Sequence, residues 1–262
     1  MRCATNGVVL RLTTRRVLAA AALLSLLPLT ACGGGDDDTT ITVLAASSLT
    51  GTFTELGKEF EQQHSGVTVK FAFDSSATLA QQATQGAPAD VLATADTDTM
   101  DSAKSAQAST PQVFATNVMV VVTPKDNPAN IQSFSDLDKS SVKFVMCVPT
   151  APCGKVGQAL LDQDHITGKP VSQEVDVKSV LAKVTEGEAD AGIVYTTDAV
   201  AAGDDVTSVP IPGSGKQLTT YPIVTLDQSK ESDLAQEFVD LVTGSTGQQV
   251  LHQAGFGKPK GA

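Results

Sequence analysis

Short apolar segments alternate with helical patterns along the chain from residue 41 onward. Ile41–Ala46 is predicted as a strand, and the apolar positions 49, 53, 56 and 60 that follow lie on one face of a helix. Further strands are predicted at 66–73, 89–96, 118–123, 141–149 and 221–227, with another ending at Tyr195. Further helices are predicted at 74–86, 97–106, 154–164, 176–187, 233–244 and 247–256. This alternation is typical of layered α/β domains.

The N-terminal segment has a different pattern, that of an export signal. Four arginines and no acid precede the apolar run Val17–Leu29, which is too short to span a bilayer. The sequence Leu29-Thr30-Ala31-Cys32 then resembles the lipobox of bacterial lipoproteins. We therefore predict a lipoprotein signal peptide at 1–31, lipidation of Cys32 and a flexible tether at 32–39, "CGGGDDDT". An ordinary secretory cleavage nearby, with no role for Cys32, is the alternative.

Removal of residues 1–31 changes the charge of the chain. It leaves 14 lysines, no arginine and 29 acidic residues, a net charge of −15. Nucleic-acid binding needs a basic surface, so we expect no nucleic-acid partner. The remaining 231 residues exceed the usual length of one domain, about 100–150 residues, which favours two lobes. We expect an extracytoplasmic protein anchored to the cell membrane by lipid.

Two cysteines, Cys147 and Cys153, remain in the body of the chain. In an oxidising compartment the pair is predicted to form a disulfide, which stabilises the fold by roughly 2–3 kcal/mol. A metal or redox site is disfavoured, because five residues separate the cysteines and no histidine lies nearby.

Several strand ends and helix starts carry residues that suit an anion. Ser48, Ser76, Cys153 and Val177 lie at or just before predicted helix N-termini, and Tyr195 ends a strand. Ligands of open α/β sheets bind outside the carboxyl ends of the strands, and helix N-termini present free N–H groups. The five positions therefore predict one crevice that holds an oxyanion with neutral donors. The alternative is that both serines are plain helix caps and Tyr195 a core residue.

The ordered motifs resemble a known family. "ITVLAASSLT", "FDSSATLAQQATQGAPADVLATAD", "ATNVMVVV", "VPTAPCGK" and "ADAGIVYTTDA" are similar, in that order, to the molybdate-binding proteins of ABC-type molybdate importers. The resemblance covers about residues 41–257. It implies a two-lobed periplasmic-binding-protein fold (type II), each lobe a sheet flanked by helices, with two crossover segments. It places lobe 1 at 40–119 and 222–262 and lobe 2 at 120–221.

The same resemblance implies the ligand and its contacts. Molybdate, and tungstate with it, would be held by the hydroxyls of Ser48 and Ser76 with adjacent N–H groups, by the backbone N–H groups of Cys153 and Val177, and by the Tyr195 hydroxyl. The protein would need no cofactor and no direct cation site, and would deliver its ligand to the membrane permease of an ABC importer. A monomer fits this mechanism.

Three positions depart from the family pattern. Cys153 stands where the family often has alanine, which is tolerable because this position would act through its backbone N–H. Asp74 stands where a small neutral residue is expected, and we predict that its carboxylate points away from the bound anion. Ser47 replaces a usual alanine, which leaves open whether Ser47 or Ser48 supplies the hydroxyl.

Other ligands and other functions compete with this interpretation. Another tetrahedral oxyanion such as sulfate would use similar donors. A secreted serine hydrolase is disfavoured, because neither serine motif has the glycines of a nucleophile elbow and the three histidines are expected at the surface. The acidic stretch Asp96–Asp101 lacks the glycine and glutamate of an EF-hand. An iron site is disfavoured because Tyr195 and Tyr221 belong to separate segments.

Overall fold

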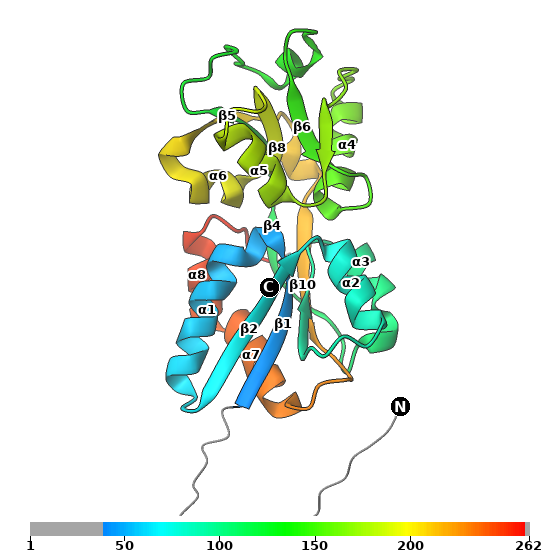
Figure 1. The fold of residues 1–262 in the computed structure, drawn as a ribbon, viewed down its shortest axis with the longest axis vertical. Helices are drawn as coiled ribbons and strands as arrows, with labels where there is room; N and C mark the ends of the chain where they lie inside the picture. Colours follow the sequence, from blue (N-terminus) through cyan, green and yellow to red (C-terminus); the bar gives the residue numbers. More distant parts are fainter. Residues whose placement is uncertain (1–38, 260–262) are drawn as a thin grey trace, which may run out of the picture. The chain divides into compact units, whose positions relative to one another are not determined.

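A computed structural model describes residues 39–259, and they form two α/β lobes (Figure 1). The predicted signal peptide and Cys32 lie outside the described residues. No helix within residues 39–259 has the length and apolar character needed to cross a bilayer.

The first sheet has the strand order β2-β1-β3-β10-β4. Its strands are β1 (Thr39–Ala46), β2 (Val67–Asp74), β3 (Val91–Ala93), β4 (Gln112–Asn117) and β10 (Thr219–Thr225). β1 is parallel to β2 and β3, whereas β10 runs antiparallel to β3 and β4. A 3-10 turn (Ser47–Leu49) leads into α1 (Thr50–Gln63), and the other helices are α2 (Ser76–Thr84), α3 (Thr97–Ser102), α7 (Ser232–Thr243) and α8 (Ser245–Gln253). We call this sheet with its five helices lobe 1.

Lobe 1 buries apolar side chains on both faces of its sheet. α1, α7 and α8 cover one face, where Phe53, Phe60 and Phe238 pack edge to face or tilted against one another and their neighbours. α2 and α3 cover the other face with Leu79 and Met100 (Figure 1). Helices on both faces explain why β3 and the second half of β1, in the interior of the sheet, are entirely apolar.

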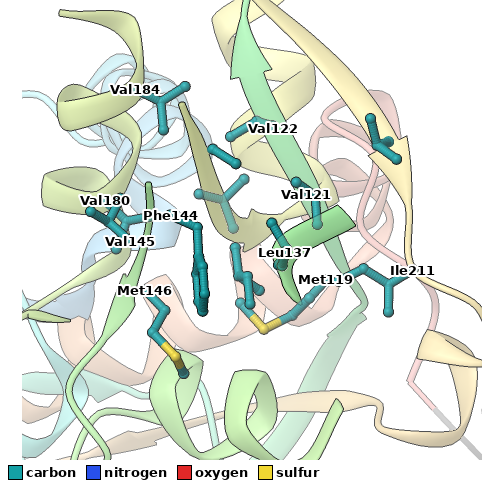
Figure 2. Close-up of a cluster of buried hydrophobic side chains, with 14 of the residues drawn as sticks. Met119, Val121, Val122, Leu137, Phe144, Val145, Met146, Val180, Val184 and Ile211 are labelled. Atoms are coloured by element: carbon teal, nitrogen blue, oxygen red, sulfur yellow. The ribbon is translucent and has the colours of Figure 1, made fainter. Parts of the chain in front are cut away.

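The second sheet has the strand order β7-β6-β8-β5-β9. Its strands are β5 (Met119–Pro124), β6 (Phe144–Cys147), β7 (Ser172–Glu174), β8 (Ala191–Tyr195) and β9 (Val206–Pro210), and its helices are α4 (Pro152–Gln163), α5 (Val177–Thr185) and α6 (Thr196–Ala202). We call this sheet with its three helices lobe 2. Figure 2 shows its core, where Phe144 and Met146 of β6 lie among side chains of β5 and α5 such as Val121 and Val180.

Two connections join the lobes, one from β4 to β5 and one from β9 to β10. The first is a single residue, Val118, so the one strand predicted at 118–123 is in fact the second of two strands that belong to different sheets. β4 was missed because its apolar run, Val113–Ala115, is short and neither glycine nor proline separates it from β5. β7, α6 and β9 were also missed, since each is short and its pattern is weak. The lobe boundaries given above stay a prediction.

Candidate functional site

The strand ends and helix starts of both lobes meet at one small pocket, whose cavity is about 10 Å³ when it is measured as room for the centre of a water molecule. Lobe 1 lines it with Ala46, Ser47, Ser48, Asp74, Ser75, Ser76 and Ala95, and lobe 2 with Ala151, Pro152, Cys153, Asp176, Val177 and Tyr195. The structure thus brings together all five residues that the sequence singled out. Their role in binding a ligand stays a prediction.

Ser48 lies in the 3-10 turn that follows β1, at the end of a parallel strand. This turn has no side-chain cap, so the Ser48 hydroxyl is not used as a helix cap. Its Oγ lies 3.1 Å from the hydroxyl oxygen of Tyr221 on β10. Ser47 lines the pocket too, and both serines are buried.

Ser76 is the first residue of α2, and the preceding Ser75 holds the N-cap position. No side chain caps this helix either. The Ser76 Oγ instead accepts a hydrogen bond, 2.9 Å long, from the backbone N–H of Ala95, which lies just after the end of β3. The simple capping interpretation is therefore wrong for both Ser48 and Ser76. The Ser76 hydroxyl keeps its own proton free for donation to another acceptor.

Cys153 lies in the first turn of α4, which begins at Pro152 rather than near Gly154 as predicted. Proline suits this position because its missing N–H has no helical partner there. The Sγ atoms of Cys147 and Cys153 lie 2.07 Å apart in a disulfide that ties the helix start to the end of β6. A Cβ on Gly154 would meet the carbonyl oxygen of Val148 at 1.9 Å, so only glycine fits in this tight turn. α4 has no side-chain cap, which leaves the Cys153 N–H without a capping partner.

Val177 is the first residue of α5, and its side chain is buried. The preceding Asp176 caps this helix, since its Oδ1 accepts the N–H groups of Lys178 at 2.7 Å and Ser179 at 3.0 Å. The cap uses the second and third N–H groups of the helix, so the first, that of Val177, is the one left for a ligand.

Tyr195 ends β8, and its side chain is 1% exposed. Within the described residues its hydroxyl has no aligned hydrogen-bond partner, and neither has that of Thr219. Burial raises the pKa of Tyr195 well above its usual value, so the phenol stays protonated and is a neutral donor. A buried hydroxyl without a partner is costly, and a bound oxyanion would satisfy it.

Tyr221 is the residue of this region that the sequence reasoning missed. Its ring lies 6.1 Å from that of Tyr195 between centroids, so the two tyrosines are neighbours despite their separation in the chain. The two tyrosines do belong to separate strands, β8 and β10, but the fold brings these strands together; no cluster of metal-binding side chains occurs among residues 39–259. Burial raises the pKa of Tyr221 as well. Asn117 Nδ2 lies 3.5 Å from the Tyr221 hydroxyl and 2.9 Å from Thr197 Oγ1. No local sequence pattern predicts these contacts of Tyr221 and Asn117.

Asp74 lies at the pocket wall, at the end of β2. One of its carboxylate oxygens, Oδ1, accepts the N–H of Ser75 at 2.5 Å. An acidic residue thus borders a crevice that is expected to take an anion. The prediction that the carboxylate points away from a bound anion stays a prediction.

The cations nearest to the pocket-lining segments are already paired with acids. Lys178 Nζ lies 2.8 Å from Oδ1 of the buried Asp198, an ion pair without the alignment of a hydrogen bond. The other Asp198 oxygen accepts the N–H of Tyr195 at 3.2 Å. Burial raises the pKa of Asp198, and the nearby Lys178 opposes that rise. Neutral N–H and O–H groups are therefore the donors that this pocket offers.

The pocket combines uncapped helix starts with buried hydroxyl groups. None of the three histidines lines the pocket, so no serine there has an imidazole base beside it. His64 is also less exposed than predicted, since its ring stacks on Phe60 at 4.0 Å between centroids. Among residues 39–259, three helix starts without side-chain caps and one buried hydroxyl without an aligned partner line this pocket. Such a set of donors suits a small anion.

A protein-family model and several known proteins match the sequence of most of this chain. The model of the family described as bacterial extracellular solute-binding protein matches residues 41–257. The molybdate-binding protein ModA of Mycobacterium bovis is 44% identical over 219 residues, 83% of this chain and 84% of that protein. ModA of Escherichia coli is 32% identical over 228 residues, 82% of this chain and 88% of that protein.

Solved structures agree on the fold. The periplasmic molybdate-binding protein of Azotobacter vinelandii matches with a TM-score of 0.72 at 20% identity, covering 84% of this chain and all of that one. The sulfate-binding protein SubI of Mycobacterium tuberculosis matches with a TM-score of 0.74 at 18% identity, covering 85% and 88%. At such identities the likeness concerns the fold alone. The predicted family resemblance and the two-lobed periplasmic-binding-protein fold are confirmed.

Proposed function

Because the chain belongs to the bacterial extracellular solute-binding proteins, we propose that it captures molybdate, and tungstate with it, for an ABC importer. The membrane permease of that importer is the partner that receives the ligand. The family function is solute binding, and in this proposal the protein performs no chemistry on its ligand.

One observation supports the proposal above all others. The buried Tyr195 hydroxyl, which has no aligned partner in the part of the chain that the structure describes, lines the same pocket as the starts of α2 and α4, which lack side-chain caps there. A doubly charged anion is costly to bury unless its oxygens are hydrogen-bonded. Hydrogen bonds to a charged group contribute about 1.5–3 kcal/mol each, which is enough to offset that cost when several act together. Ser48, Ser76, Cys153 and Val177 supply further donors on both sides of the ligand.

The choice of molybdate rests on the relatives, both of which are named molybdate-binding proteins. Sulfate is the second candidate, because the structure of a sulfate-binding protein has the same fold. Both anions are tetrahedral dianions, so the same donors serve either one. The size of the closed pocket then decides which anion fits all of its hydrogen bonds.

The proposal extends to the location of the protein. Lipidation of Cys32 would hold the chain at the outer face of the cell membrane, next to the permease. The acidic and glycine-rich residues after Cys32 suit a flexible tether. A monomer suffices, since both lobes of one chain line the pocket.

Titration calorimetry tests the ligand. Residues 33–262, which contain every described helix and strand, are titrated with molybdate, tungstate, sulfate and phosphate in turn. The expected result is tight one-to-one binding of molybdate and tungstate and no measurable heat from the other two. Binding of sulfate in place of molybdate would overturn the ligand assignment. Absence of binding by all four anions would overturn the oxyanion function itself.

A further inference from the structure

An ion pair joins the two lobes beside the pocket. Lys155 lies on α4 of lobe 2, and its Nζ is 3.0 Å from Oδ2 of Asp96, which follows β3 in lobe 1. The same Nζ lies 3.7 Å from Oδ2 of Asp98. The pocket-lining residues Ala95 and Cys153 stand next to Asp96 and close to Lys155 in the chain. The pair therefore crosses from one wall of the pocket to the other.

We propose that Lys155 is a closure residue, whose ion pair with Asp96 and Asp98 holds the two lobes together and slows release of the bound anion. The inference rests on the proposed function in one respect, that a ligand enters and leaves as the lobes separate. Separation moves α4 away from the end of β3, so the ion pair must break before the ligand leaves. Lys155 is thus assigned to release, and no contact with the ligand is assigned to it.

Both ends of the pair are held in place by other interactions. The second Asp96 oxygen, Oδ1, accepts the N–H of Thr99 at 2.6 Å and so caps α3. The Asp96 side chain is only 18% exposed. On the other lobe, the disulfide of Cys153 ties the start of α4 to β6, two residues before Lys155. Fixed ends lower the entropy that is lost when the ion pair forms, so this pair costs less to form than one between two mobile side chains.

The second carboxylate adds to the effect. Asp98 is 80% exposed and adds a second negative charge 3.7 Å from Lys155 Nζ, without a hydrogen bond. Because Lys155 is itself 40% exposed, solvent screens the pair, and the expected effect is about two- to fivefold on the release rate rather than an on–off switch. The effect also falls as salt rises, because partly exposed ion pairs are screened.

A competing account is that Lys155 simply attracts the anion through its charge. The two accounts differ in sign for Asp96→Asn. If Lys155 attracts the anion directly, removal of a nearby negative charge strengthens binding. If the ion pair holds the lobes together, the same substitution speeds release. The asparagine side-chain oxygen still caps α3, so this variant keeps the helix start.

The test measures the dissociation rate of molybdate by stopped-flow fluorescence competition with residues 33–262. Lys155→Gln and Asp96→Asn are both expected to release molybdate about two- to fivefold faster than the parent chain, and Lys155→Arg to restore the slow rate. The matched control is Lys104→Gln, which removes the same charge from an exposed lysine for which no ion pair occurs among the described residues. An unchanged rate in Lys155→Gln, or slower release in Asp96→Asn, overturns the proposal.

A ligand-free measurement separates this inference from the proposed function. The radius of gyration of the unliganded chain is measured by small-angle X-ray scattering. The ion pair predicts a larger radius for Lys155→Gln than for Lys104→Gln, whether or not molybdate is the true ligand. Equal radii would overturn the role of Lys155 in closure. A larger radius in a chain that fails to bind molybdate would support closure and remove only the ligand assignment.

Discussion

The hydroxyl oxygens of Ser48 and Tyr221 lie 3.1 Å apart, although 173 residues separate them. Ser48 lies in the 3-10 turn after the first strand of lobe 1, and Tyr221 lies on β10, the strand that returns the chain from lobe 2. The contact with Tyr221 orients the hydroxyl of Ser48, which lines the pocket. It also joins the pocket to Asn117, at the end of the strand that leads into lobe 2. Tyr221 is therefore a supporting residue of the proposed site.

Replacement of Tyr221 by Phe is expected to weaken molybdate binding by about three- to tenfold, because Ser48 loses the partner that orients its hydroxyl and one hydrogen bond is worth roughly 1 kcal/mol. The ring itself is kept, so the fold should remain. Calorimetry measures the effect, with Tyr195→Phe as comparator. Removal of the Tyr195 hydroxyl, a direct donor to the ligand, should weaken binding more than removal of the Tyr221 hydroxyl, which only supports Ser48. Equal affinities of Tyr221→Phe and the parent chain would contradict the supporting role.

Ser76→Ala is expected to weaken binding by about tenfold or more, because a hydrogen bond to a charged group is lost. The substitution also leaves the N–H of Ala95 without its acceptor, so a modest loss of stability should accompany it. Thermal unfolding therefore needs to be measured beside the dissociation constant. Thr84→Ala, at the far end of the same helix, is the control. An unchanged dissociation constant would remove Ser76 from the site.

Asp74→Asn is expected to strengthen binding of molybdate by about two- to fivefold, since a negative charge at the pocket wall repels an anion and interactions of partly exposed charges are worth roughly 0.2–1 kcal/mol. The amide oxygen can still accept the N–H of Ser75. Affinities at low and high salt check this, because the gain should shrink as salt rises. Weaker binding would indicate that the carboxylate supports the site rather than opposing it.

Loss of the disulfide is expected to affect both stability and binding. The variant with Cys147→Ala and Cys153→Ala should lose about 2–3 kcal/mol in free energy of unfolding on the chain-entropy model. Because the bridge ties the start of α4 to β6, the Cys153 N–H should also be held less firmly and molybdate should bind less tightly. Denaturant titration and calorimetry measure the two effects. Addition of a reductant to the parent chain should reproduce them, and should leave the double variant unchanged.

His64 is expected to make stability depend on pH. Its Nδ1 lies 2.9 Å from the Phe60 carbonyl oxygen and its Nε2 2.7 Å from Glu237 Oε2, so the protonated ring donates to both. These acceptors, the Phe60 carbonyl above all, raise the pKa of His64 above its usual value. The stabilisation is therefore complete below the unfolded-state pKa of about 6.5 and is lost as the pH rises through the higher folded-state pKa.

Unfolding midpoints of the parent chain and of His64→Gln test this dependence between pH 5 and 9. The difference between the two proteins should be largest at the acidic end and should shrink toward the basic end. His252→Gln, at an exposed position, is the control and should follow the parent chain. A difference that grows with pH would show that the neutral ring is the stabilising form.

The sequence by itself determined the α/β class, most strands and helices and the five candidate positions of the site. The reason is that these features are local. A helix start is marked by the few residues around it, as with Ser75 and Ser76, and a buried strand such as β1 by a short apolar run. The order of the motifs supplied the family.

Only the tertiary structure decided the division of 112–124 between two sheets, because a single residue separates β4 from β5 and neither glycine nor proline marks the boundary. The conformation of the short segments β7 and α6 likewise depends on tertiary contacts with other elements, which local sequence patterns do not predict. The contacts of Ser48 with Tyr221 and of Lys155 with Asp96 join residues that are 173 and 59 positions apart. Such pairs depend on where the chain crosses between the lobes, and a local sequence pattern cannot predict that geometry.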